Sequence, residues 1–368
     1  MTDMEDYTEE MPRHRRLVKT IKHHWLTLAF IGGFITDFLL LNRVDDVIDN
    51  TTLIVYVVLA TLSLLVFYAS IARRFGDVRS LTTERYASAV MQYAFGGLFS
   101  GMLIFYGKSG AILSSWPFLL LIISAIAGNE LIKNRGQQLV FNLYAYFVGV
   151  FAFVTLQLPI LTGQMGGWMF FGSSIVALLF VYGVVQLLTL IIPNYLYLEM
   201  RKIVFVILGT FAIFQALYMT NIIPPIPLSL KEITIAQSVV RVGNEYEVVY
   251  EPAPWWQFWR RVNHDFHPSG TNTVACFTRV FAPTRLSTSI NHVWEYKDDN
   301  DKWVEHFRLG YPITGGGDDG YRGYTAISSF RDGTWRCRVE TDRGQVIGQQ
   351  VFQIDTTEKP DELVRVID

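Results

Sequence analysis

Residues 52–72 read TLIVYVVLATLSLLVFYASIA, a run of apolar and small polar side chains without a single charge. At a rise of about 1.5 Å per residue, a helix of this length covers the roughly 30 Å of hydrocarbon in a bilayer. A hydrophobic content of 51% would also fit a large soluble enzyme, but here the apolar residues gather in runs of bilayer length. The stretch therefore predicts a transmembrane helix in an integral membrane protein.

Further runs of this kind follow along the first 220 residues. They are 25–41, 87–106, 111–128, 139–158, 170–192 and 203–220. Together with 52–72 they predict an α-helical membrane bundle of about seven helices in residues 23–220, preceded by a basic tail in residues 1–22.

The basic residues between these runs predict the orientation of the bundle. One set of alternating loops, with the N-terminal tail, holds thirteen Lys and Arg side chains: Arg13, Arg15, Arg16, Lys19, Lys22, Arg73, Arg74, Arg79, Arg85, Lys133, Arg135, Arg201 and Lys202. The other set holds Arg43 and Lys108. Because positively charged loops stay in the cytoplasm, we expect a cytoplasmic N-terminus and, after an odd number of crossings, an outer C-terminus.

Three polar side chains inside the predicted spans are candidate site residues: Asp37, Gln92 and Asn142. An ionisable residue within a membrane span suggests a functional role. The sequence favours an interfacial position for Asp37, one turn from the helix end and near Arg43, over a buried proton-handling role. Gln92 and Asn142 are expected to form interhelical hydrogen bonds, each worth about 0.6 kcal/mol.

Gly97 and Gly101 form a GxxxG pattern on one predicted helix. Such a pair lets another helix approach closely. Packing within the chain is the favoured interpretation, and a homodimer seam is the alternative.

The character of the chain changes after residue 220. Prolines at positions 224, 225 and 227 predict an extended linker over residues 221–232. Eight short runs between residues 233 and 354 then alternate apolar with polar side chains. This pattern predicts an all-β, Ig-like sandwich over residues 233–355, followed by a C-terminal tail over residues 356–368.

Several motifs in this region occur in a recognisable order. They are His292-Val-Trp-Glu-Tyr296, Gly320-Tyr-Arg-Gly-Tyr324, Gly333-Thr-Trp-Arg336 and Gly344-Gln-Val-Ile-Gly348 followed by Phe352. Residues 271–354 thereby resemble the bacterial domain-of-unknown-function family numbered 2914. The resemblance implies a small β-sandwich of bacterial envelope proteins, often attached to membrane helices, and supplies no catalytic residues. It places the outer domain in the periplasm and the helices in the bacterial inner membrane, within a bundle that belongs to an uncharacterised bacterial family.

An aromatic and basic cluster near the start of the outer domain is a candidate contact surface: Trp255, Trp256, Phe258, Trp259, Arg260 and Arg261. Tryptophan is enriched at membrane–water interfaces, where nearby arginines can reach lipid phosphates. We expect this cluster to contact membrane lipid. A sugar-stacking platform and packing beneath the sandwich are the alternatives.

Both cysteines, Cys276 and Cys337, fall in predicted strands of the outer domain. They could meet across the sandwich, and an oxidising compartment would favour a disulfide. Two buried free thiols remain an equal alternative. With two cysteines and no clustered ligand motif, the sequence predicts no metal site and no cofactor.

The sequence contains no arrangement of residues typical of catalysis, and a net charge of −2 gives little support for nucleic-acid binding. We therefore expect a non-enzymatic envelope protein whose partners are membrane lipid and an envelope protein or glycan. The alternative is a small-molecule or lipid transporter, or a lipid-handling membrane enzyme, with its site among the helices.

Overall fold

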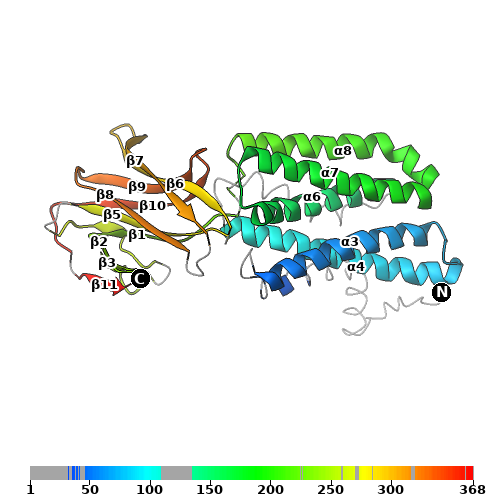
Figure 1. Cartoon of the computed structure of the whole chain (residues 1–368), viewed down its shortest axis with the longest axis horizontal. Helices are drawn as coiled ribbons and strands as arrows, with labels where there is room; N and C mark the ends of the chain where they lie inside the picture. Colours follow the sequence, from blue (N-terminus) through cyan, green and yellow to red (C-terminus); the bar gives the residue numbers. More distant parts are fainter. Residues whose placement is uncertain are drawn as a thin grey trace, which may run out of the picture.

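The computed structural model describes residues 32, 35–37, 39, 41, 46–108, 135–223, 225, 227–257, 260–269, 273–283, 285–315, 320–360 and 362–367. Long helices lie side by side along the longest axis of the molecule, and a β-rich domain sits at one end of them (Figure 1). The predicted division into an N-terminal helical part and a C-terminal β-rich part is confirmed.

Five helices in the described residues are long and apolar enough to cross a membrane. They are α3 (Val47–Ile71), α4 (Asp77–Lys108), α6 (Arg135–Thr162), α7 (Gly167–Ile191) and α8 (Pro193–Met219). Each contains most or all of one predicted apolar run and usually extends beyond it, because helical hydrogen bonding continues into the polar residues at the ends of the run.

Two predicted spans have no complete counterpart among the described residues. Residues 111–128 lie outside them, and of 25–41 only positions 32, 35–37, 39 and 41 are described, the first five with helical backbone. The count of seven crossings stays a prediction.

The connections between helices define the two ends of the bundle. The α3–α4 turn and the α7–α8 junction lie together at the end away from the β-domain (Figure 1). Arg74 in this turn donates to the carbonyl oxygens of Leu190 and Ile191 at the end of α7, at 3.3 and 3.4 Å. The opposite end holds the α6–α7 loop and the last residue of α8, Met219, from which the chain enters the β-domain.

The bundle interior is packed with aromatic rings. Phe151 of α6 stacks on Phe214 of α8, with ring centroids 4.5 Å apart, and Phe170 of α7 stacks on Tyr218 of α8 at 4.0 Å. Since lipid tails are as apolar as these side chains, close packing of this kind is a main source of helix association in a bilayer.

Three sheets make up the β-domain. The first has the order β1-β5-β8, from β1 (Ser229–Ala236), β5 (Val274–Phe281) and β8 (Tyr321–Ile327). The second has the order β4-β10-β9-β6-β7, from β4 (Asp265–Phe266), β6 (Ser287–Lys297), β7 (Trp303–Thr314), β9 (Gly333–Thr341) and β10 (Val346–Ile354). The third has the order β11-β3-β2, from β2 (Ser238–Val242), β3 (Glu245–Tyr250) and β11 (Val364–Ile367).

The first two sheets face one another across a buried core. A disulfide between Cys276 of β5 and Cys337 of β9 joins them, and Trp294, opposite Cys337 in the β6–β9 pairing, is fully buried. On the other face of the first sheet, Phe277 meets Tyr246 of β3 with ring centroids 5.7 Å apart, so the third sheet covers that face.

The structure refines the predicted strands at three places. The first predicted strand divides at Gln237 into β1 and β2, and β1 begins at Ser229, inside the expected linker. Strand β11 lies in the expected C-terminal tail and pairs with β3. A four-residue strand is too short to show the alternation by which strands are recognised in a sequence.

Candidate functional site

A buried polar centre lies where the partly described first helical segment meets α3 and α4. The Asp37 side chain is 0% exposed. The hydroxyl of Tyr56 on α3 donates to its Oδ1 at 2.6 Å. The hydroxyl of Ser100 on α4 contacts its Oδ2 and also lies 2.8 Å from the carbonyl oxygen of Gly97.

The interfacial depth that the sequence favoured for Asp37 stays a prediction, and the structure adds that the side chain is buried between helices. Hydroxyl partners on two neighbouring helices hold the carboxyl group inside the bundle, and these partners could not be recognised before the helices were placed together. Arg43, the expected ion-pair partner, lies outside the described residues.

The two glycines of the GxxxG pattern pack against α3 of the same chain. A Cβ atom added at Gly97 would lie 2.5 Å from the Tyr56 ring, and one at Gly101 would lie 2.9 Å from Leu53. Gly97 thus makes room for the tyrosine ring whose hydroxyl reaches Asp37. These contacts lie within the chain, as in the favoured interpretation, and the homodimer seam stays a prediction.

Gln92 and Asn142 are also buried, at 2% and 0% exposed. The Asn142 amide donates to the hydroxyl of Tyr68 at 3.1 Å, while its Oδ1 has no hydrogen-bond partner. Asn142 lies on α6 and Tyr68 near the end of α3, so this contact joins the two helices near the end away from the β-domain.

Other polar pairs between α3 and α6 occur at separate heights in the bundle. The Tyr146 and Thr61 hydroxyls are 2.7 Å apart, and Gln157 donates to Asn50. Along α3, positions 50, 56, 61 and 68 are separated by about 7–10 Å at a rise of 1.5 Å per residue. These gaps exceed a hydrogen-bond length, so these described pairs are separate interhelical contacts.

In the β-domain, the aromatic and basic cluster lies in the segment that follows β3. Trp255 and Trp256 are 92% and 55% exposed, and Arg260 is exposed. Phe258 and Trp259 lie outside the described residues. Arg261 donates to Glu232 at 2.6 Å and to the Tyr250 hydroxyl at 3.1 Å, so this cation is engaged within the domain.

The contact of Arg261 with Glu232 shows which strand this segment lies against. Residues 252 and 262 form a β-bridge, so the segment between them is a hairpin. Glu232 belongs to the first half of β1, the strand that follows the exit from α8. The hairpin therefore returns along β1 toward the membrane end of the domain.

A buried histidine lies beside the disulfide. His292 of β6 is 0% exposed, and its Nε2 lies 2.9 Å from the Thr278 hydroxyl and 2.8 Å from that of Tyr311. Its Nδ1 lies 3.0 Å from the Thr325 hydroxyl. Burial lowers the pKa of His292 to about 3, which keeps the imidazole neutral.

Apart from the alternation that puts His292 on the core face, no sequence signal singles out this buried cluster. Cys276, His292 and Cys337 lie close enough together to hold a metal ion. The two sulfur atoms are bonded to each other, however, and thiolates are the form of cysteine that binds metal. The disulfide therefore removes two of the three ligands.

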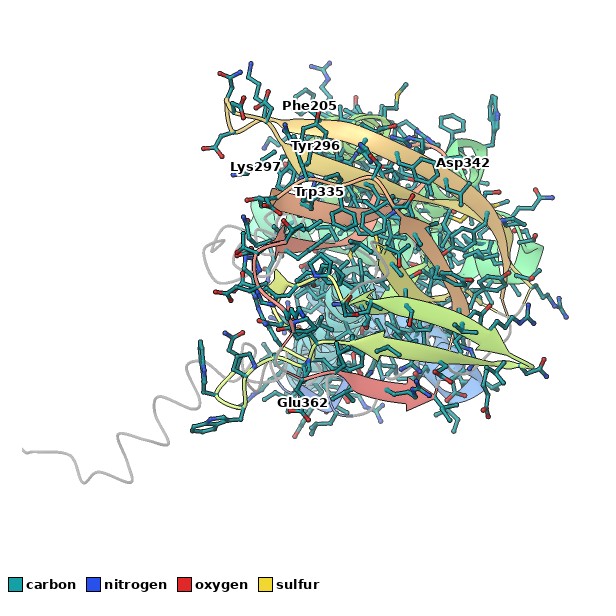
Figure 2. The ribbon with its side chains drawn as sticks, turned by 90° about the vertical axis from the view of Figure 1, so that its left-hand side faces the viewer. Phe205, Tyr296, Lys297, Trp335, Asp342 and Glu362 are labelled. Carbon is teal, nitrogen blue, oxygen red and sulfur yellow. A yellow bond between two sulfur atoms is a disulfide. The ribbon has the colours of Figure 1, made fainter. Side chains whose placement is uncertain are left out.

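The end of the β-domain farthest from the bundle carries a second aromatic and basic surface. We define the distal cluster as Tyr296, Lys297, Trp303, Arg331 and Arg336; the neighbouring Trp335 is buried in the core and is not part of this surface. Tyr296 and Trp335 lie side by side, with ring centroids 5.4 Å apart, next to Lys297 (Figure 2). Arg331 lies 4.2 Å from the centre of the Tyr296 ring, and Arg336 lies 4.1 Å from that of Trp303. Cations over aromatic faces at these distances are attractive contacts.

Strand β9 shows why this cluster is distal. Its last residues lead into the turn that contains Arg343, and the Arg343 guanidinium lies 4.5 Å from the centre of the Tyr218 ring on α8. Trp335 and Arg336 lie near the other end of the same nine-residue strand. At about 3.3 Å per residue, the two ends are separated by roughly 25–30 Å.

Comparison with known proteins identifies part of this domain. Residues 287–354 match the family described as Protein of unknown function (DUF2914). The resemblance seen in the sequence is thus confirmed within the expected range of 271–354. No curated protein matches the chain.

A search of solved structures matches the alkylpurine DNA glycosylase AlkC of Pseudomonas fluorescens, bound to DNA containing an abasic site analogue. The identity is 7% and the TM-score is 0.20, with 86% of this chain and 100% of that chain covered. A TM-score this low carries no argument about fold or function.

The DUF2914 region runs from the start of β6 to the end of β10. One face of its sheet bears an ion-pair network: Arg308 contacts Glu305 and Glu340, and Arg336 and Arg338 contact Glu295. Glu295 and Glu340 are buried, so the arginines neutralise carboxylates that would otherwise be costly to desolvate. This network offsets its own charges and leaves no strongly charged patch.

Contacts of several kinds hold the DUF2914 region on the bundle. The Asn221 amide donates to the carbonyl oxygen of Arg343 at 2.9 Å, and the Gln345 amide donates to that of Ile223 at 3.1 Å. Gly163 in the α6–α7 loop adopts a φ of +69° and lies against the backbone of Arg285, where a Cβ would come within 2.7 Å of the carbonyl oxygen. Both the linker and a helix loop therefore fix the domain to the end of the bundle.

Proposed function

We propose that this chain is a multi-pass protein of the bacterial inner membrane that binds a partner in the cell envelope through its β-domain. In this proposal about seven helices cross the membrane, the N-terminus is cytoplasmic and the β-domain is periplasmic. The position of Arg73 and Arg74 at the end of the bundle away from the β-domain supports this orientation, because basic loops are retained in the cytoplasm.

We further propose an Ig-like sandwich for the β-domain. The strand orders β1-β5-β8 and β10-β9-β6-β7 support it, since an Ig sandwich divides its strands between two sheets in this way. The disulfide between facing strands, with the buried Trp294 opposite Cys337, is a second supporting feature.

The observation that carries the binding role is the placement of the distal cluster. The membrane end of the domain is occupied by contacts with the linker and the α6–α7 loop, whereas the distal cluster faces away from them. Its rings and cations are suited to an envelope protein, through aromatic and Arg anchors, or to a glycan, through stacking on Trp303. The chemistry is that of a binding surface, and the role proposed is scaffolding without catalysis.

The hairpin that carries Trp255 and Trp256 is proposed to contact membrane lipid. Its return along β1 and the exposure of both indole rings support an interfacial position, where tryptophan is favoured. Arg260 is then the cation available for lipid phosphates, since Arg261 is engaged with Glu232.

A photo-crosslinking amino acid at position 303 of the full-length protein tests the binding role in growing bacterial cells. We expect a crosslinked product that mass spectrometry identifies as protein or glycan. The same amino acid at position 197, an exposed tyrosine on α8, serves as the control. Absence of a product specific to position 303, together with full function of a Trp303→Ala variant, would remove the distal cluster from the proposal.

Labelling of single introduced cysteines with a membrane-impermeant maleimide tests the orientation. Glu358→Cys lies in the β-domain and Asp77→Cys at the start of α4, and the native side chains are 74% and 86% exposed. We expect labelling of the first variant in cells with a permeabilised outer membrane, and of the second only after lysis. The reverse pattern would invert the proposed topology.

The buried polar centre favours a second candidate function, a transporter or a lipid-handling membrane enzyme with its site around Asp37. This function requires that Asp37→Asn, Gln92→Ala and Asn142→Ala impair complementation of a deletion strain. If all three variants complement fully while a chain truncated after residue 232 does not, the binding role is retained and this candidate is dropped.

A further inference from the structure

Asp37 belongs to a chain of three contacts in which every hydrogen must be assigned. Its Oδ1 lies 2.6 Å from the Tyr56 hydroxyl oxygen, and its Oδ2 contacts the Ser100 hydroxyl oxygen. The Ser100 oxygen also lies 2.8 Å from the carbonyl oxygen of Gly97. These are four oxygen-bearing groups joined by three close oxygen–oxygen contacts, each of which needs a hydrogen between its two atoms.

An ionised Asp37 leaves these three contacts with two hydrogens, so Ser100 would have to share one hydrogen between two acceptors. The Tyr56 hydrogen serves the first, but Ser100 has one hydroxyl hydrogen for two acceptors, the carboxylate and the Gly97 carbonyl, neither of which has a hydrogen to give. One of the two contacts would then bring two oxygen atoms together without a full hydrogen bond between them. In an interior of low dielectric this arrangement is costly.

A protonated Asp37 satisfies all three contacts. Tyr56 donates to Oδ1, the acid hydrogen on Oδ2 is donated to Ser100, and Ser100 donates to the Gly97 carbonyl. The hydrogens of one carboxylic acid and two hydroxyl groups thus match the three contacts in number and direction. Tyr93, which also hydrogen-bonds with the Tyr56 hydroxyl, has a hydrogen of its own to donate and leaves this count unchanged.

The charges around Asp37 agree with this assignment. Among the described residues, no Lys, Arg or His forms an ion pair with Asp37, and its side chain is fully buried. The charged group that acts on it electrostatically is another buried carboxyl group, Asp49 of α3, which disfavours a second negative charge. An unpaired buried carboxylate costs several kcal/mol, and such a group takes up a proton instead. The Tyr56 hydroxyl is held in place because its ring fits against Gly97.

We propose that Asp37 is a proton-binding site in the interior of the helical bundle, a carboxylic acid that stays neutral at the pH of the cell in a cage formed by Tyr56, Ser100 and the Gly97 carbonyl. This proposal is independent of the function proposed for the β-domain. The ligand is the proton itself, and the cage has a donor and an acceptor positioned for the neutral acid.

Infrared spectroscopy of the full-length protein tests the proposal directly. The protein is prepared in a detergent without ester groups at pH 8, with and without ¹³C-labelled aspartate. We expect one carbonyl band of a protonated carboxylic acid that shifts on labelling and again in D₂O. Absence of an aspartic acid band from the wild-type protein at this pH would overturn the proposal, without relying on any variant.

Substitutions then assign the band. Asp37→Asn should remove the acid band and leave the carboxylate bands unchanged, whereas Asp46→Asn should remove carboxylate intensity only, because Asp46 is an exposed N-cap residue of α3. Loss of carboxylate intensity in Asp37→Asn would show an ionised Asp37 and overturn the proposal. Should Asp37→Asn not fold, Ser100→Ala keeps the acid and removes its acceptor, so the band should move to higher frequency. An unmoved band would contradict the assigned cage.

Discussion

Lowering the pH from 7 to 5 should destabilise the β-domain through His292. The folded state holds this imidazole neutral, because burial lowers its pKa to about 3, whereas an unfolded histidine has a pKa of about 6.5. As the pH falls, the unfolded chain therefore binds a proton before the folded chain does. The stability that neutral His292 provides at pH 7 is lost progressively below about pH 6.5 and down to about pH 3.

The size of the effect follows from the two pKa values. Between pH 7 and pH 5 the unfolded state goes from largely neutral to almost fully protonated at this residue, and the folded state binds almost no proton. Integration of the proton uptake gives a loss of about 2 kcal/mol in the free energy of unfolding. Because both pH values lie well above 3, the result depends mainly on the unfolded pKa.

Hydrogen exchange of the full-length protein in detergent measures this loss. Peptides from β6 and β9 report the opening free energy of the sheet that contains His292, after correction for the intrinsic pH dependence of exchange. The variant His292→Gln has no group to protonate, so its opening free energy should fall by about 2 kcal/mol less than that of the wild type over the same range. Equal falls in the two proteins would refute the assignment of the effect to His292.

Three further results are expected. Gly97→Ala should lower the stability of the bundle in thermal unfolding by about 1–3 kcal/mol through overlap with Tyr56, while Gly209→Ala, with open space around its Cβ, should not. Glu295→Gln should lower the free energy of unfolding of the β-domain by about 1–3 kcal/mol, because two arginines lose their buried partner. The exposed Glu305→Gln should lower it by less than about 1 kcal/mol, and urea unfolding measures both changes. Alkylation under non-reducing conditions should modify no thiol in periplasmic material, and reduction of Cys276–Cys337, which closes a separation of 61 residues, should destabilise the domain by about 2–4 kcal/mol.

The position of Asp37 shows how far local sequence can be read in a membrane protein. Its distance from the end of an apolar run, and a nearby arginine, favoured the interface. The burial of its side chain between hydroxyl groups could not be predicted, because Tyr56 and Ser100 come from helices whose rotation about their axes is not visible in the hydropathy pattern. Interhelical partners of this kind depend on which faces meet, and no local signal records that choice.

In the β-domain, alternation along a strand predicts which side chains are buried but not which strands and loops they meet. Alternation along β9 puts Trp335, Cys337 and Val339 on one buried face, because side chains along a strand point alternately to its two sides. It could not bring Arg336 of β9 next to Glu295 of β6, or Arg331 over Tyr296. Those contacts depend on strand register and on loops, which join residues far apart in the chain.

Long apolar helices followed by a β-rich domain can be read from the chain alone, because hydropathy over bilayer length and alternation along strands are local properties. The DUF2914 resemblance comes from short motifs in a fixed order, which are local as well. The hydroxyl groups around Asp37, the packing of Gly97 against Tyr56 of the neighbouring helix, and the position of the distal cluster away from the bundle become visible only in the folded protein. These features arise from residues on different elements, and their positions are set by packing between elements and not by any one segment.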